Sequence, residues 1–118
     1  MEINPHFYGA YLNLGVLFKI KGDYDIAILY LNKAIEMDKR IFESFLSRAS
    51  LFLQIDELNK AYEDIEIAMK IKDNNADSYY IRGSIRWRKG LHEESINDFK
   101  MASIFDKNMT NCIVDFYL

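Results

Sequence analysis

A repeat of 34 residues constrains this chain more than any other feature of its sequence. Gly15, Ala49 and Gly83 lie 34 positions apart, and the residues around them fall into matching columns, small beside small and large apolar beside large apolar. A period of this length indicates a short supersecondary unit that is repeated along the chain. The clearest columns are Tyr11, Phe45 and Tyr79; Ala27, Ala61 and Ser95; Leu31, Ile65 and Phe99; and Ala34, Ala68 and Ala102.

Each unit contains two stretches with helical spacing. Apolar residues recur three or four positions apart in both halves of a unit, which places them on one helix face. Short breaks centred on Gly22, Asp56 and Gly90 separate the halves, and we expect the glycines to end first helices and Asp23 or Asp56 to cap second ones. Because the turns are short, the paired helices should be antiparallel. The predicted first helices are 7–20, 41–54 and 75–88, and the predicted second helices are 24–37, 58–71 and 92–105.

The small residues at one column have a mechanical explanation. Two helix axes approach closely only where no large side chain lies between them, so Gly15, Ala49 and Gly83 should mark the crossing within each unit. Each helix pair leaves one apolar face uncovered. We therefore expect the units to stack on one another and bury that face.

These columns resemble those of the tetratricopeptide repeat family, whose unit is a helix–turn–helix of 34 residues. The resemblance implies an all-α, right-handed superhelical solenoid of antiparallel helix pairs, with units at about 5–38, 39–72 and 73–106 and a partial or capping helix at 107–118. Arg86 and His92 depart from the aromatic residues of the family pattern. The first unit fits best, through Tyr11, Leu14, Gly15, Phe18, Gly22, Tyr24, Ala27, Leu31 and Ala34.

Both ends of the chain align with parts of further units. Residues 2–5 match 36–39, the end of the first unit, and residues 110–118 match the opening of a fourth first helix. Such arrays usually end in a helix with a polar outer face, so the apolar residues near Phe116 favour a segment of a longer array. The alternative is a natural three-unit protein whose last short helix covers the third unit. Exposed end helices would also allow self-association.

Composition and charge argue against several classes of function. The net charge of −3 provides no basic excess for coating DNA or an anionic membrane. No apolar run reaches the roughly 18 residues of a membrane helix, so no membrane partner is expected. Cys112 is the single cysteine and cannot form an internal disulfide, which favours a reducing compartment. We expect a cytoplasmic protein, with the nucleus as the alternative.

The titratable residues do not form a catalytic pattern. His6 lies in the first helix cap and His92 replaces a packing tyrosine, so a surface or packing role is the simpler interpretation for both. His92, Glu93 and Glu94 lack the second histidine of a zinc-binding helix motif. No glycine-rich phosphate loop is present. We expect no enzyme activity, no metal and no cofactor.

The family resemblance implies that the function lies in a surface. First helices line a concave face in this family, and apolar anchors with a polar rim imply a protein or peptide segment as the partner. Trp87 is expected to be partly exposed beside Tyr80 and Leu53. The alternatives are that Leu12 and Leu46 complete the packing between units and that Trp87 turns inward. The residues assigned to the groove are Leu12, Asn13, Val16, Lys19, Leu46, Ser47, Ser50, Leu53, Tyr80, Ile81, Ser84, Trp87 and Arg88, with Glu43, Gln54 and Asp77 beside them.

One known ligand class of the family is disfavoured. The chaperone-tail clamp uses lysine, arginine and asparagine to grip a terminal carboxylate pair. The columns that this clamp requires hold Leu12, Val16, Ser47, Asp77 and Ile81 in this chain. None of these residues fits the clamp.

A basic run in the third unit is a second candidate site. Arg82, Arg86, Arg88 and Lys89 could receive an acidic peptide, phosphate or RNA, with Trp87 stacking on a base. These cations lie toward a predicted helix C-terminus, where the helix dipole favours them. Nucleic acid is therefore not the expected partner.

Differences between the units predict two internal ion pairs. Where the first helix carries Leu14, the second helix carries Tyr30. In the other two units, an arginine at the first of these positions is matched by an aspartate at the second. This coordinated change predicts partly buried pairs within the units. The predicted pairs are Arg48–Asp64 and Arg82–Asp98.

Overall fold

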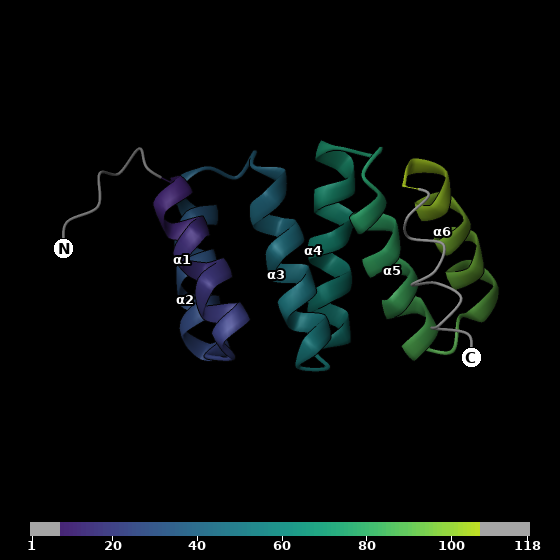
Figure 1. Cartoon of the computed structure of the whole chain (residues 1–118), viewed down its shortest axis with the longest axis horizontal. Helices are drawn as coiled ribbons and strands as arrows, with labels where there is room; N and C mark the ends of the chain where they lie inside the picture. The colour runs from purple at the N-terminus through teal and green to yellow at the C-terminus, as the bar shows by residue number, and fades with distance from the viewer. Residues whose placement is uncertain (1–7, 107–118) are drawn as a thin grey trace.

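The computed structural model describes residues 8–106, and in that part of the chain it contains six α-helices. The helices form three antiparallel pairs that follow one another along the long axis of the molecule (Figure 1). Every predicted helix is present, and the predicted capping helix at 107–118 lies outside the described residues. The helices are α1 (Tyr8–Lys21), α2 (Tyr24–Met37), α3 (Phe42–Gln54), α4 (Leu58–Ile71), α5 (Ala76–Arg88) and α6 (His92–Phe105).

The turn within each pair contains one residue in the left-handed backbone region. Gly22 (φ 94°) and Gly90 (φ 84°) adopt it without a side-chain clash, and Asp56 (φ 62°) holds the same position between α3 and α4. The prediction that Asp23 or Asp56 caps a second helix holds only for the position of Asp23, which is the N-cap residue of α2. Asp23 precedes α2 without a side-chain cap hydrogen bond, and α4 is preceded by Glu57. Asp56 instead occupies the left-handed position, which aspartate tolerates better than most residues do.

A missing or minimal side chain allows the two helices of each pair to cross closely. A Cβ atom added at Gly15 would lie 2.7 Å from Leu31 Cγ, and one added at Gly83 would lie 2.7 Å from Phe99 Cε1. Both distances are shorter than a van der Waals contact. The backbones of α5 and α6 are close enough for Ser95 Oγ to donate a hydrogen bond of 2.7 Å to the carbonyl oxygen of Gly83. The crossing therefore depends on these small residues.

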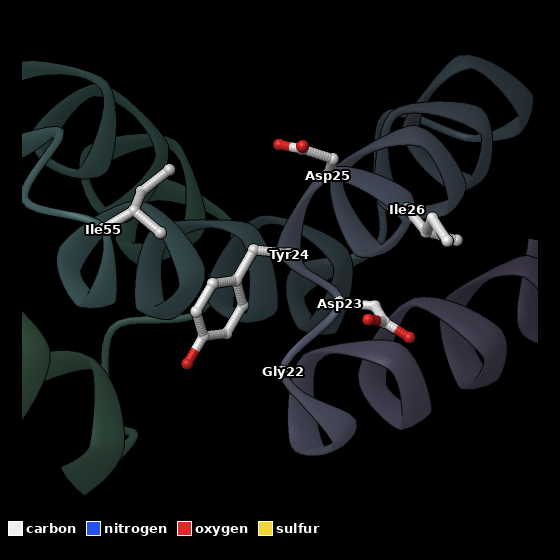
Figure 2. A pocket seen from close by; sticks show the side chains of 6 residues that line it. All are labelled: Gly22, Asp23, Tyr24, Asp25, Ile26 and Ile55. Carbon is white, nitrogen blue, oxygen red and sulfur yellow. The ribbon is translucent and has the colours of Figure 1, made fainter.

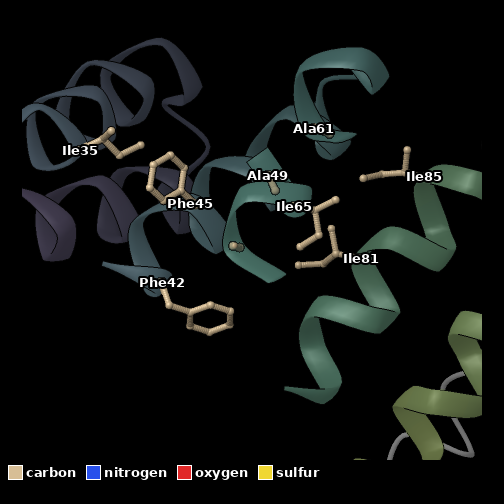
Figure 3. Packing of buried hydrophobic residues seen from close by; sticks show 9 residues of the cluster. Ile35, Phe42, Phe45, Ala49, Ala61, Ile65, Ile81 and Ile85 are labelled. Carbon is tan, nitrogen blue, oxygen red and sulfur yellow. The ribbon is translucent and has the colours of Figure 1, made fainter. Parts of the chain in front are cut away.

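The largest buried cluster connects the second helix of one pair to the first helix of the next. Ile35 of α2 and Phe45 of α3 belong to it, as do Ile65 of α4 and Ile85 of α5 (Figure 3). Leu51 of α3 packs in a separate cluster with α2. The largest cluster thus contains residues of all three pairs, as stacking requires.

One repeat column shows the effect of a neighbouring pair. Leu51 and Ile85 have a preceding pair and are 0% exposed, whereas Leu17 on α1 is 61% exposed. Ile20 and Leu29 of the first pair are also exposed, at 76% and 67%. Leu17 alone therefore marks an apolar end face on the first pair, since the residues that match Ile20 and Leu29 in the other pairs are exposed as well.

Both predicted ion pairs form in the structure. Arg48 Nε and Nη2 each donate a hydrogen bond of 2.7 Å to the carboxylate of Asp64, and Arg82 Nη2 donates one of 2.8 Å to Asp98. The aspartates are 3% and 2% exposed, and the arginines are half-buried. Paired hydrogen bonds between arginine and carboxylate are among the stronger polar contacts in proteins.

Each of these arginines also reaches back to the preceding pair. Arg48 Nη1 donates to Asn32 Oδ1 at 2.8 Å, and Arg82 Nη1 donates to Glu66 Oε1 at 3.2 Å. Burial opposes the charge of Arg82, but its hydrogen bonds to Asp98 and Glu66 outweigh burial and raise the pKa of Arg82. One side chain thus ties three helices together.

The close crossing predicts that two glycine substitutions affect the free energy of unfolding differently. Gly83→Ala should destabilise the protein by about 1–3 kcal/mol, because the added methyl overlaps the Phe99 ring. Gly9→Ala is the control, since nothing lies within 4 Å of a Cβ atom there, and it should be neutral or stabilising by up to about 1 kcal/mol. Urea unfolding measures both values. Equal effects would contradict the proposed close crossing.

The ion pairs predict a loss of stability that a second substitution recovers. Arg48→Leu leaves Asp64 buried without its main partner and should cost about 3–5 kcal/mol. The double variant Arg48→Leu, Asp64→Tyr copies Leu14 and Tyr30 of the first pair and should recover most of the loss. Breaking the exposed Lys33–Glu36 pair with Glu36→Gln should cost less than about 1 kcal/mol. A double variant as unstable as Arg48→Leu would refute this account.

Candidate functional site

The first helices of the three pairs line a groove, called here the first-helix groove. Its apolar part consists of Leu46, Leu53, Tyr80 and Ile81, and small or polar side chains surround them. Most residues assigned to the groove from the sequence line it, as do the neighbouring Gln54 and Asp77. The complete lining is Lys19, Leu46, Ser47, Ser50, Leu53, Gln54, Asp77, Tyr80, Ile81 and Arg88.

A lysine links α1 to α3 at one edge of the first-helix groove. Lys19 lies in the last turn of α1, where the helix dipole favours a cation. Its Nζ atom donates a hydrogen bond of 2.9 Å to Ser50 Oγ of α3. Burial lowers the pKa of Lys19, because an ammonium group loses solvation there.

An arginine links α5 to α3 at the same end of the first helices. Arg88 Nη1 donates a hydrogen bond of 2.8 Å to the carbonyl oxygen of Leu53, which belongs to the last turn of α3. The same carbonyl oxygen also accepts a backbone hydrogen bond of 3.1 Å from Asp56 N. Arg88 Nη1 also lies 3.8 Å from Asp56 Oδ1, in an exposed ion pair.

Several residues assigned to the groove from the sequence lie outside its lining. Leu12 packs against the buried cluster that contains Leu31 and Leu51, which agrees with the packing alternative for Leu12. Ser84 is 3% exposed, and its hydroxyl donates to the carbonyl oxygen of Tyr80 at 2.9 Å. Asn13 is exposed and Val16 is half-buried, and neither contributes to the lining.

Trp87 does not lie in the groove beside Leu53 and Tyr80. Its ring packs against His92 at the start of α6, with 4.3 Å between the ring centroids, and the side chain is half-buried. The other two members of its repeat column lie against the next pair. Lys19 reaches α3 and Leu53 packs against the cluster that contains residues of α5, so Trp87 points away from the space between α3 and α5.

The cations of the basic run all have partners within the chain. Arg86 sits where the family pattern has an aromatic residue, and its Nη1 atom donates to Asp98 Oδ2 at 2.9 Å. Arg82 and Arg88 make the contacts given above. Lys89 Nζ donates to Asn59 Oδ1 at 2.8 Å. This run is therefore largely engaged in holding α5 to its neighbours.

A second hollow lies at the turn between α1 and α2. Gly22, Asp23, Tyr24, Asp25 and Ile26 line it together with Ile55 of α3. Figure 2 shows that the two aspartate side chains point in different directions. Asp23 also pairs with Lys21 at 3.5 Å. The polar groups do not converge there, so this hollow lacks the arrangement that a ligand site needs.

A third hollow lies over Arg48 between α2 and α4. Its charged groups include Asp64 and Arg48, which already satisfy each other. Residues 8–106 contain no group of three or more histidine, cysteine, aspartate or glutamate side chains that could hold a metal ion.

No helix within residues 8–106 has the length and apolar character needed to cross a membrane.

Comparisons with known proteins give consistent results. A family model described as tetratricopeptide repeat matches residues 8–40 and 76–102. Human DnaJ homolog subfamily C member 3 is 28% identical over 95 residues, which are 80% of this chain and 19% of that protein. TPR repeat-containing thioredoxin TDX of Arabidopsis thaliana is 32% identical over 85 residues, 72% of this chain and 22% of that protein. The chain thus spans about a fifth of the length of these relatives.

A solved structure has the same arrangement of helices. The second TPR of Spaghetti (RPAP3), bound to the HSP90 peptide SRMEEVD, matches with a TM-score of 0.82 over 87% of this chain and 95% of that one. The two sequences are 22% identical. At this identity the similarity establishes the all-α helical solenoid.

Proposed function

The chain belongs to the tetratricopeptide repeat family, and we propose that it is a non-catalytic module that binds a peptide or protein segment in the first-helix groove. The observation that carries the proposal is the groove itself, where Leu46, Leu53 and Tyr80 form an apolar surface between polar edges. Such a combination suits a segment with apolar anchors. The same proposal places the module in the cytoplasm, because its single cysteine suits a reducing compartment.

A related structure supports this class of ligand. The similar Spaghetti domain is bound to a peptide in its structure. The polar links from Lys19 to Ser50 and from Arg88 to Leu53 hold α1, α3 and α5 in a fixed spacing. A groove that is already formed loses less conformational entropy when a segment binds.

A large side chain placed in the groove should weaken peptide binding without unfolding the chain. Peptides of about 12 random residues, displayed with both ends fused to carrier protein, would be selected on the immobilised wild-type chain. Ser47→Tyr places a ring among the lining residues and should weaken the selected peptides at least about tenfold. Asn13→Tyr is the matched control, because Asn13 shares the repeat column of Ser47 but is exposed outside the lining.

Fluorescence anisotropy gives the affinities, and thermal unfolding shows that both variants fold. Failure to enrich any peptide would contradict the proposed function. Equal binding by the two variants would place the ligand outside the first-helix groove.

The apolar end face favours a structural role as the second candidate function. Leu17 is exposed on the first pair, whereas Leu51 and Ile85 in the same repeat column are buried by a neighbouring pair. A second copy of the chain that covers this face would extend the stack.

Sedimentation analysis at increasing concentration tests the structural role. Self-association through the end face predicts a mass that rises with concentration for the wild type and stays monomeric for Leu17→Glu. A monomeric wild type at all concentrations would contradict it. Ser47→Tyr is the control, since a change in the groove should leave self-association intact.

A further inference from the structure

Lys19 differs from the other half-buried cations of the chain. Its Nζ atom contacts the neutral hydroxyl of Ser50, and among residues 8–106 no carboxylate forms an ion pair with it. Arg48, Arg82 and Arg86 are also half-buried, and each lies against a carboxylate. A cation removed from water is normally compensated by an opposite charge. Within the described chain, Lys19 is compensated by a hydroxyl alone.

The surroundings of Lys19 suit an anion that is attached to an apolar group. The ammonium group has three donor hydrogens, of which Ser50 Oγ accepts one. The Ser50 hydroxyl keeps its own hydrogen for a further acceptor, and the amide of Gln54 lines the same groove. Leu53 and Tyr80 provide apolar surface in the same groove. The groove therefore combines unused donors with an apolar wall.

We propose that Lys19 and Ser50 bind the side-chain carboxylate of an aspartate or glutamate within the bound segment, while a neighbouring apolar side chain of that segment packs on Leu53 and Tyr80. This proposal rests on the proposed function of the first-helix groove. A bound carboxylate would restore the compensation that Lys19 lacks and form a charge-assisted hydrogen bond. It would also raise the pKa of Lys19, which burial lowers in the free chain.

The charges of the groove also suggest the orientation of the segment. Asp77 lies in the first turn of α5, and Arg88 is the last residue of that helix. Asp77 is the acid of the lining, and Lys19 and Arg88 are its cations. A complementary segment places its acidic residue at Lys19, near the last turn of α1, and a basic residue at Asp77, in the first turn of α5.

The carboxylate is assigned to a side chain because the groove lacks the family's grip on a chain terminus. The columns of the terminal carboxylate clamp hold Leu12, Val16, Ser47, Asp77 and Ile81. Lys19 is outside those columns. Asp77 would repel a terminal carboxylate placed near it.

A double-mutant cycle on the selected peptides tests the proposal. We expect the peptides enriched by the wild-type chain to share one aspartate or glutamate beside a large apolar residue. Replacing that acid with its amide should weaken binding to the wild type by about tenfold. The same replacement should change binding to Lys19→Met by less than about twofold, because methionine keeps the apolar stem and removes the charge.

Two controls separate a ligand contact from a structural effect. Lys33→Met removes an exposed lysine of α2 and should retain the tenfold preference for the acid. Nuclear magnetic resonance titration of the lysine side chains should show the Lys19 pKa rising when the acidic peptide binds and staying unchanged with its amide counterpart. If Lys19 had only a structural role, its pKa would be the same with the acidic peptide and with its amide counterpart.

The outcomes distinguish this proposal from the proposed function. Selected peptides without a shared acid would overturn the Lys19 contact and leave the groove function in place. The same tenfold loss on Lys19→Met would also overturn it, since the acid would then be bound elsewhere. Tighter binding of a selected sequence with a free C-terminus than with an amidated one would replace the side-chain carboxylate with a terminal one. A chain that enriches no peptide would refute the proposed function itself.

Discussion

The close approach of two helix axes within each pair is the constraint on which the structure depends. At Gly15 and Gly83, a single Cβ atom would overlap Leu31 or Phe99. The large side chain on the second helix therefore fills the space that the glycine on the first helix leaves open. Once the helices are this close, their remaining apolar residues point outward from the pair. A pair cannot bury those residues alone, and stacking follows. The groove exists because stacking places α1, α3 and α5 side by side (Figure 1).

Two half-buried arginines add directional hydrogen bonds to the apolar packing, which has no preferred direction. Arg48 bonds to Asp64 in its own pair and to Asn32 in the preceding pair, and Arg82 repeats the arrangement with Asp98 and Glu66. A sliding movement between pairs would break hydrogen bonds to nearly buried carboxylates, which costs more than the same movement in an apolar contact. The arginines therefore fix the register of neighbouring pairs.

The fold was predictable from the sequence because its signals are local and repeated. The 34-residue period, the helical spacing and the small residues at the crossing all indicated the same helices. Comparison of the repeats also predicted the Arg48–Asp64 pair, since both residues change together. It missed Asn32 and Glu66, which lie 16 positions before the arginines rather than after them. The spacing of 16 positions could have suggested these two partners. Comparison of the units could not, because Leu14 replaces the arginine in the first unit and no described helix precedes that unit.

The groove was predictable where neighbouring helices fix the direction of a side chain. Leu46, Ser47 and Tyr80 line it as the register implied. Ser84 was assigned to the same surface but turns its hydroxyl to the carbonyl of Tyr80. Trp87 was misplaced because the direction of its ring depends on His92, a residue of the next helix. Such a contact follows from three-dimensional packing, and helical spacing alone does not specify it.

The repeat columns divide into those that build the fold and those left to recognition. Ala27, Ala61 and Ser95 occupy one column and are 0% exposed, so packing restricts them to small residues. Lys19 and Leu53 also share a column, yet one is a cation and the other is aliphatic. Both line the groove, where packing tolerates different chemistry. If the groove binds a segment as proposed, we expect ligand preference to reside in this second kind of column.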